Sequence, residues 1–215
     1  MEYKIRVKLL SDTIFGSGES VPGVVDSEVL HDQHGLPYMK GKTLKGRLRE
    51  ESDMLRRCLP KSAEMDAAHN AIYGSGGDDC RVHMTFSDLE LDGNLRAVIE
   101  GIIADKANDV DEMDVLQAVT SIYTATSIDY ETGKAEKGTL RKSRVIKSGL
   151  VFYAGLSADW ELTEKEEAFL GASVAALRYL GVAVTRGRGN VECSLLRDDR
   201  DITEECVNKL LEVDA

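Results

Sequence analysis

The carboxylate of Asp26 is the first side chain whose setting could support chemistry. Asp26 follows a segment rich in glycine and serine, residues 11–25, and stands beside Ser27 and near Glu28. A carboxylate in such a loop can act as a general base or help to hold a divalent metal. One carboxylate is a poor Mg²⁺ site unless phosphate oxygens and waters fill the other positions. The alternative is that Asp26 only caps a turn.

A cluster of basic and hydroxyl side chains occupies the segment GKTLKGRLR, residues 41–49. The residues of interest there are Gly41, Lys42, Thr43, Lys45, Arg47 and Arg49. At the start of a helix, free backbone N–H groups, a hydroxyl and cationic groups together suit a phosphate backbone, and Gly41 permits close approach. The alternative is a solvated basic helix face.

Two glycine-rich loops could let the backbone approach a ligand closely. The first holds Gly16 and Gly18, and the second, TRGRGN, alternates arginine with glycine. The residues of the second loop are Arg186, Gly187, Arg188 and Gly189. A helix C-cap followed by a hairpin turn is the ordinary explanation of this pattern. Contact with RNA is favoured only because the loop occurs together with the segment GKTLKG.

A polar arm from Thr124 to Lys147 has Tyr130 near its tip. Its basic side chains are Lys134, Lys137, Arg141, Lys142, Arg144 and Lys147. A flexible basic hairpin could wedge between base pairs and flip a nucleotide out, which leaves the phosphodiester open to in-line attack. A disordered surface loop is the alternative.

Four side chains of zinc-ligand type fall in one region, at Cys58, His69, Cys80 and His83. Their spacings of eleven, eleven and three residues match no tight CxxC knuckle. These residues could form a zinc site. The alternative is that Cys58 and Cys80 are semi-buried thiols and that His83 lies on the surface of a strand.

The composition is that of a soluble globular protein: 215 residues, 42% hydrophobic, 30% charged and a net charge of −11. This acidity argues against binding nucleic acid over the whole surface. However, residues 40–57 hold seven bases against three acids, and residues 131–147 hold six against two. The sequence shows neither a membrane helix nor a signal peptide, so we expect a cytoplasmic protein with reduced cysteines and no membrane partner.

Hydrophobic periodicity predicts the elements that must position these residues. Residues 3–9 alternate as a half-buried strand, and a helix with leucines on one face begins at Thr43. Residues 81–91 alternate as a further strand. The acidic and poorly periodic segment after them is expected to be an insertion or a peripheral element.

The second half of the chain has a similar order of elements. One strand precedes the arm and another follows it. Thr163 and Glu166 form a capping box for a helix whose apolar stripe ends at Gly181. A turn and a strand come next, and a short amphipathic helix runs from Thr203 to Val213. Strand, helix, strand, repeated once, predicts an α+β protein with a split βαβ, ferredoxin-like layout.

Four motifs occur together in order: SDTIFGSGES, VDSEVLHDQHGLPYMKGKTLKGRLREE, IYGSGG followed by RVHMTFSDLEL, and YLGVAVTRGRGNVE. In these motifs, from Ser11 to Glu192, the chain resembles the RAMP superfamily of CRISPR-associated proteins, most closely the backbone subunit of type III effector complexes. The resemblance implies a modified ferredoxin-like, RNA-recognition-motif-like fold as a single domain over residues 1–215. It also implies a thumb hairpin around 124–147 and peripheral insertions, one of which, around 58–83, binds zinc in some relatives.

The resemblance further implies a function. Copies of the subunit assemble with other subunits along a CRISPR guide RNA, and each inserts its thumb into the guide–target duplex. Active members cut target RNA with a loop aspartate and Mg²⁺ or another divalent metal, and this aspartate matches Asp26. The segments GKTLKGRLR and TRGRGN match the guide-binding helix start and the glycine-rich loop. One departure is Phe15, at a position that is often histidine in the family.

Two other functions stay open. The subunit could form only the scaffold that coats the guide, with another protein as the nuclease. It could instead be a guide-processing ribonuclease of the same superfamily, which would need His31 or His34 for general acid–base chemistry. Lone histidines beside a turn are more often simple polar surface residues.

Overall fold

The central strand of the protein, β1 (Tyr3–Leu9), buries every second side chain, as its alternating sequence predicts. The computed structural model describes residues 1–60, 62–74 and 84–212. β1 pairs antiparallel with β6 (Val151–Ser157) on one side and with β7 (Val191–Arg197) on the other.

Short strands complete the sheet at both edges. β2 (Thr85–Phe86) pairs with β6, and β8 (Arg200–Asp201) pairs with β7, giving the order β2-β6-β1-β7-β8. β3 (Glu90–Leu91) also pairs with β6. All of these pairs are antiparallel, with the two long strands β6 and β7 flanking β1. The predicted α+β, ferredoxin-like layout is confirmed.

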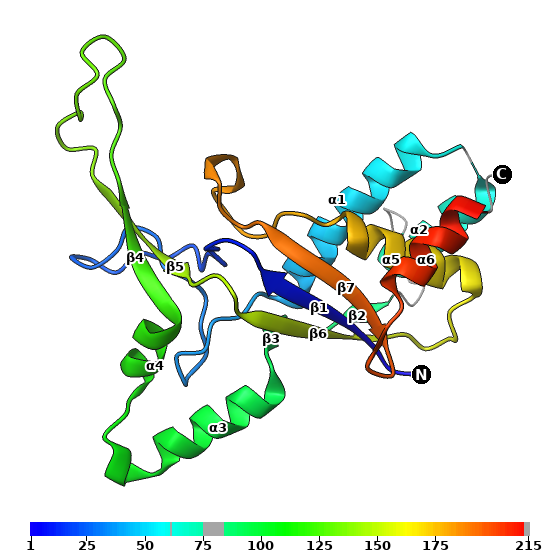
Figure 1. Cartoon of the computed structure of the whole chain (residues 1–215), viewed down its shortest axis with the longest axis horizontal. Helices are drawn as coiled ribbons and strands as arrows, with labels where there is room; N and C mark the ends of the chain where they lie inside the picture. The colour runs from blue at the N-terminus through cyan, green and yellow to red at the C-terminus, as the bar shows by residue number, and fades with distance from the viewer. Residues whose placement is uncertain (61, 75–83, 213–215) are drawn as a thin grey trace.

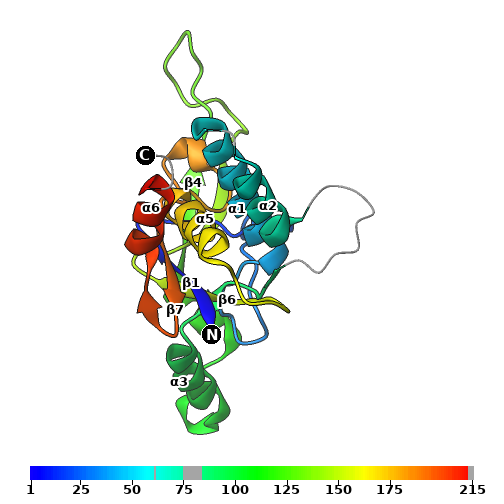
Figure 2. The same cartoon turned by 90° about the vertical axis from the view of Figure 1, so that its right-hand side faces the viewer.

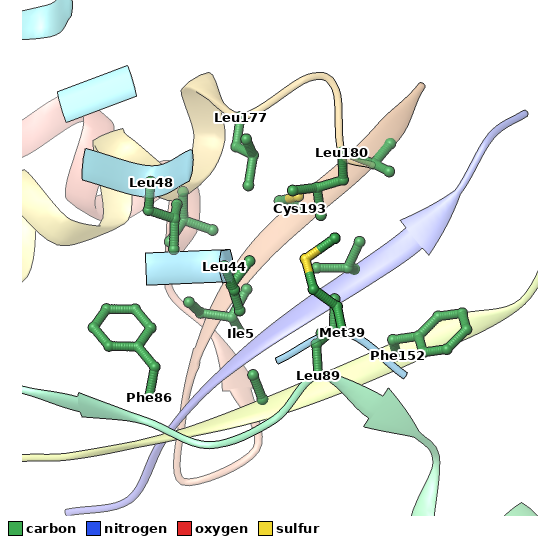
Figure 3. Close-up of a cluster of buried hydrophobic side chains, with 14 of the residues drawn as sticks. Ile5, Met39, Leu44, Leu48, Phe86, Leu89, Phe152, Leu177, Leu180 and Cys193 are labelled. Carbon is green, nitrogen blue, oxygen red and sulfur yellow. The ribbon is translucent and has the colours of Figure 1, made fainter. Parts of the chain in front are cut away.

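Four helices lie on one face of the sheet (Figures 1 and 2). They are α1 (Gly41–Cys58), α2 (Ala63–Tyr73), α5 (Glu164–Ala176) and α6 (Thr203–Glu212). Figure 3 shows Leu44 and Leu48 of α1 directed toward the sheet, where Ile5 lies. These three side chains are fully buried. The core therefore fixes the start of α1 against the central strand.

The helices α1, α2 and α5 differ from what the sequence predicts. α1 begins at Gly41, slightly before the expected Thr43, and α5 ends at Ala176, well before Gly181. α5 stops there because the chain beyond it is extended and pairs with the approach to β7: Leu180 N–H donates to Gly189 O at 2.8 Å. α2 has no counterpart among the elements expected from the sequence.

The strand predicted over residues 81–91 is interrupted, and residues 81–83 lie outside the described residues. Between β2 and β3, Leu89 exchanges two backbone hydrogen bonds with Met39, of 2.8 and 3.0 Å. This exchange turns the backbone of Leu89 away from β6 and divides the expected strand in two.

The acidic segment after β3 forms a helical insertion. It consists of α3 (Gly93–Ala104), a 3-10 turn η1 (Lys106–Asn108) and α4 (Glu112–Val119). Arg96 of α3 turns inward and lies 2.8 Å from the carboxylate of Asp32. In Figure 1, α3 of the insertion and the connection of the arm point in opposite directions, α3 toward the bottom and the arm toward the top.

The basic arm is an antiparallel hairpin of β4 (Thr120–Ala125) and β5 (Arg141–Ile146). β4 begins at Thr120, before the predicted start of the arm at Thr124, and β5 ends at Ile146, next to the predicted end at Lys147. The connection between the strands extends far from the rest of the protein (Figure 1). Within the described part of the chain, no helix is long and apolar enough to cross a membrane.

Candidate nucleic-acid interface

Asp26 is exposed and lies against the hairpin rather than in a free loop. Its carboxylate Oδ2 accepts a hydrogen bond of 2.7 Å from the backbone N–H of Lys142 in β5. In return, the N–H of Asp26 donates to the carbonyl of Lys142 at 2.8 Å. Because two backbone-directed bonds hold Asp26, its carboxylate has a defined place at the base of the hairpin.

Glu28 does not supply a second free acid beside Asp26. Its side chain is only 7% exposed, and Oε1 accepts hydrogen bonds from the N–H of Val29 and from Nε of Arg144, both at 2.8 Å. Arg144, which the sequence placed among the bases of the arm, is therefore buried in an ion pair and does not face solvent. This corrects the expected charge of the arm.

A divalent metal would find one accessible carboxylate here. Among residues 1–60, 62–74 and 84–212, no group of three or more His, Cys, Asp or Glu side chains could hold a metal ion. Glu28 is committed to Arg144, and Oδ2 of Asp26 is committed to Lys142. The described residues around Asp26 therefore supply too few ligands for a Mg²⁺ site by themselves, since Mg²⁺ requires near-octahedral coordination.

The start of α1 lines a groove of about 310 Å³. Thr43 and Arg47, one turn apart on α1, face this groove together with Gly16 of the first glycine-rich loop. Its remaining lining comes from Phe15, Ser17, Leu30, Tyr38, Met39, Lys40, Gly181 and Val182. The structure thus brings the first loop, the basic helix start and the segment after α5 to one place.

The basic residues of α1 are not equivalent. Lys42 is exposed at the first turn, and no acidic side chain lies in that turn. Lys45 instead donates from Nζ to the carbonyl of Met84 at 2.8 Å and lies 5.7 Å from the centroid of the Phe86 ring. Burial, together with the charge of Arg49, lowers the pKa of Lys45. Lys45 is engaged within the protein, whereas Lys42 is available to an anion.

Gly41 is required by packing inside the protein. A Cβ at this position would lie 2.2 Å from the carbonyl oxygen of Phe86 and 2.5 Å from that of Ser87. Its N–H donates to Asp88 Oδ1 at 2.8 Å. The close approach that the sequence suggested for a ligand is therefore made by the chain itself, at the junction of α1 and β2.

The arginines of the second glycine-rich loop also differ. Arg186, in the 3-10 turn η2 (Val184–Arg186), is exposed. Arg188 lies over the ring of Tyr123 in β4, with its guanidinium carbon 3.7 Å from the ring centroid. Gly187 and Gly189 both have a positive φ, so the loop depends on them for its shape. Gly18, in the first loop, is exposed with φ +83°.

Five of the six bases of the arm are exposed: Lys134, Lys137, Arg141, Lys142 and Lys147. Tyr130 near its tip is fully exposed. Of these bases, Lys147 donates to the carbonyls of Gln117 and Ala118, at 3.4 and 2.6 Å, and so caps the end of α4. The arm therefore carries fewer free charges than its sequence suggested.

Histidines near the candidate site face other acids. His31 lies 3.3 Å from Glu112, and His34 lies 3.9 Å from Glu100, so both connect their turn to the helical insertion. Phe15, at the position where histidine was expected from the family, is buried with its ring edge-on to Phe152. None of these three positions presents an imidazole to Asp26.

The expected zinc ligands are only partly described. His69 is buried on α2 against Phe169 and Tyr73, and Cys58 is exposed at the end of α1 rather than semi-buried. Cys80 and His83 lie outside the described residues. Zinc binding by this set stays a prediction. The described cysteines Cys58, Cys193 and Cys206 are free thiols, as expected.

Comparisons with known proteins agree with this architecture. A family model described as the RAMP superfamily matches residues 6–192. No curated protein sequence matches the chain. A chain in the cryo-EM structure of the Type III-B Cmr-beta complex bound to cognate target RNA is 15% identical, with a TM-score of 0.64 over 96% of this chain and 99% of that chain. A chain of the apo state is 15% identical, with a TM-score of 0.66 over 93% and 99%. At this identity the likeness concerns the fold alone.

Proposed function

The chain belongs to the RAMP superfamily, and from this premise we propose that it is a backbone subunit of a type III CRISPR effector complex. Several copies would coat a guide RNA together with other subunits, and Asp26 would act in the cleavage of target RNA. The matched segment, residues 6–192, includes Asp26, the start of α1, the hairpin and the second glycine-rich loop. The carrying observation is the place of Asp26, held by Lys142 at the base of a basic hairpin.

The guide-binding part of the proposal is supported by the groove at the start of α1. Because the N–H of Gly41 is bonded to Asp88 and the N–H of Thr43 to the carbonyl of Lys40, this support comes from side chains at the helix start. Thr43 and Arg47 line the groove, with Nη1 of Arg47 also paired with Glu50, and Lys42 is exposed in the first turn of α1. Such contacts hold a backbone without reading its sequence. A subunit of this kind would leave sequence recognition to base pairing by the guide.

The cleavage part assigns Asp26 the role of general base. Its carboxylate would accept the proton of a target ribose 2′-hydroxyl, whose oxygen then attacks the adjacent phosphorus. The 5′-oxygen leaves with a proton from solvent, so the products carry a 2′,3′-cyclic phosphate and a 5′-hydroxyl. The divalent cation expected from the family would take most of its ligands from RNA and water, because Glu28 is paired with Arg144 and leaves Asp26 as the accessible acid of residues 26–28.

The deciding experiment compares reconstituted complexes that contain wild-type subunit, Asp26→Ala or Asp159→Ala. Asp159 is an exposed aspartate in the loop between β6 and α5, and it controls for loss of a surface charge. We expect Asp26→Ala to retain the guide and to lose target cleavage by about 100-fold or more, the scale of a lost general base. Normal cleavage by Asp26→Ala would leave the non-catalytic scaffold as the function of this subunit.

A further inference from the structure

Residues 26–28 and 142–144 form a short parallel zipper between the Asp26 loop and β5. Asp26 exchanges two hydrogen bonds with Lys142, Ser27 forms a parallel bridge with Ser143, and the N–H of Arg144 donates to the carbonyl of Ser27 at 2.9 Å. The zipper ends at the side-chain pair of Glu28 and Arg144. The loop and the hairpin are therefore joined over three successive residues.

The Glu28–Arg144 pair also reaches the other strand of the hairpin. Arg144 Nη1 donates to Oγ1 of Thr120 in β4 at 3.4 Å, and that hydroxyl donates in turn to the carbonyl of Leu116 in α4. Only 5% of the Arg144 side chain and 7% of the Glu28 side chain are exposed. One buried pair thus links the Asp26 loop, both strands of the hairpin and the end of α4.

A buried ion pair of this kind is poorly explained by stability alone. Desolvation of two charges offsets most of their attraction, and apolar side chains of similar volume often serve a core equally well. What an ion pair adds is direction, because a guanidinium and a carboxylate meet only in a narrow range of geometries. Glu28 lies two residues after Asp26, and Arg144 lies two residues after Lys142. A fixed geometry of the ion pair therefore also fixes how Asp26 lies against Lys142.

We propose that Glu28 and Arg144 are positioning residues that make the Asp26 loop and the hairpin move as one unit, so that placement of the hairpin on RNA also places the Asp26 carboxylate. This inference rests on the proposed function of Asp26. Neither Glu28 nor Arg144 touches the reacting atoms; both act through the zipper that holds Asp26 against Lys142.

The test uses the reconstituted complex with guide and target RNA. The variants are Glu28→Gln, Arg144→Lys and the double variant Glu28→Leu/Arg144→Met, which removes both charges and keeps an apolar core. We expect the double variant to bind guide and target normally but to cut 10- to 100-fold more slowly in a single turnover, roughly the effect of misplacing a catalytic group by an ångström. Arg144→Lys, which keeps the charge, should restore part of the rate.

Two further measurements separate positioning from general loss of structure. In an Asp26→Ala background, adding Glu28→Gln should cause no further loss of cleavage, because the pair acts through Asp26. Amide hydrogen exchange of the pair variants should be faster at Asp26 and Lys142 than in the wild type, and this readout does not depend on catalysis.

Arg197→Met is the matched control, because it breaks another ion pair, in which Nη1 of Arg197 lies 2.7 and 2.9 Å from the oxygens of the buried Glu167 carboxylate. It should lower thermal stability and leave the cleavage rate of assembled complexes unchanged. The proposed coupling of the Asp26 loop to the hairpin would be refuted by any of three results in the double variant. These are normal cleavage, loss of guide binding, and unchanged amide hydrogen exchange at Lys142. Normal cleavage by Asp26→Ala would instead refute the proposed function, while the exchange result would still stand.

Discussion

The guanidinium of Arg188 lies face-on to the ring of Tyr123, 3.7 Å from its centroid. The same side chain is 3.8 Å from the carboxylate of Asp12 and is only 13% exposed. Arg188 belongs to the second glycine-rich loop and Tyr123 to the base of the hairpin, so the contact joins two parts of the candidate interface. Arg188 serves the internal structure of the protein, whereas its neighbour Arg186 faces solvent.

This difference predicts opposite effects of two similar substitutions. Arg186→Ala should weaken guide binding and reduce the slope of log affinity against log salt concentration by about one, the effect of one lost phosphate contact. The free energy of unfolding should not change. Arg188→Ala should lower the free energy of unfolding by roughly 1–2 kcal/mol, the range of a partly desolvated cation–π contact. Fluorescence anisotropy at several salt concentrations and urea denaturation measure the two effects.

A double-mutant cycle identifies the contact responsible. Tyr123→Leu keeps an apolar side chain but removes the aromatic face, so it should destabilise the wild type and have little effect once Arg188 is alanine. If the two substitutions lower the free energy of unfolding additively, the stacking of Arg188 on Tyr123 contributes nothing to stability.

Lys42 and Lys45 should also separate into one binding residue and one structural residue. Lys42→Gln removes an exposed charge at the start of α1 and should weaken binding of any guide sequence to a similar degree. Lys45→Gln removes the hydrogen bond to Met84 O and the contact with Phe86, so the free energy of unfolding should fall by about 1 kcal/mol. Equal losses of RNA affinity from both substitutions, with unchanged stability, would contradict this assignment.

Features that depend on near neighbours in the chain were predictable from the sequence. The alternation of residues 3–9 is the burial pattern of β1, and the capping box of Thr163 and Glu166 is present at the start of α5. Both depend on contacts within one strand or one helical turn. The end of α5 was not predictable in this way, because the extended chain after Ala176 pairs with residues that lead into β7.

In the candidate site the residue types were predictable but their partners were not. Arg144 and Lys134 look alike in the sequence of the arm, yet Arg144 is buried against Glu28, from which it is separated by 116 positions in the chain. The basic pattern of α1 likewise gives no sign that Lys45 binds a carbonyl of the chain. Tyr123 carried no signal at all, since an aromatic residue in a strand is ordinary. Such pairings arise only from tertiary contacts.

Two glycines in α1 should respond in opposite directions to alanine. Gly41→Ala would place a methyl group 2.2 Å from a backbone oxygen, and we expect a loss of about 1–3 kcal/mol in the free energy of unfolding. Gly46 is an exposed helical position where a Cβ meets nothing within 4 Å. Gly46→Ala should therefore stabilise the protein by about 0.5–1 kcal/mol, because alanine loses less backbone entropy in a helix. Urea denaturation of the two variants tests both predictions. Equal changes in the free energy of unfolding would refute the packing role of Gly41.

His69 should make stability depend on pH. Its ring is 3% exposed and packs against Tyr73 and Phe169. Burial lowers the pKa of His69 below its ordinary value. This effect outweighs the hydrogen bond with Asn70 and the carboxylate of Asp53, 3.2 Å from Nε2, which both favour the charged form. The folded protein therefore holds His69 neutral under conditions in which the unfolded chain binds a proton.

The sign of the pH effect follows from this difference in proton binding. As the pH falls below about 6.5, the ordinary histidine value, the unfolded state gains a proton that the folded state does not, and the free energy of unfolding decreases until the lower, folded pKa is reached. His69→Gln should flatten this part of the profile. Urea denaturation between pH 5 and 8 measures the slope, with EDTA present because His69 belongs to the predicted zinc set. A wild-type protein that gains stability on acidification through this range would show that Asn70 and Asp53 together favour the charged form by more than the cost of burial.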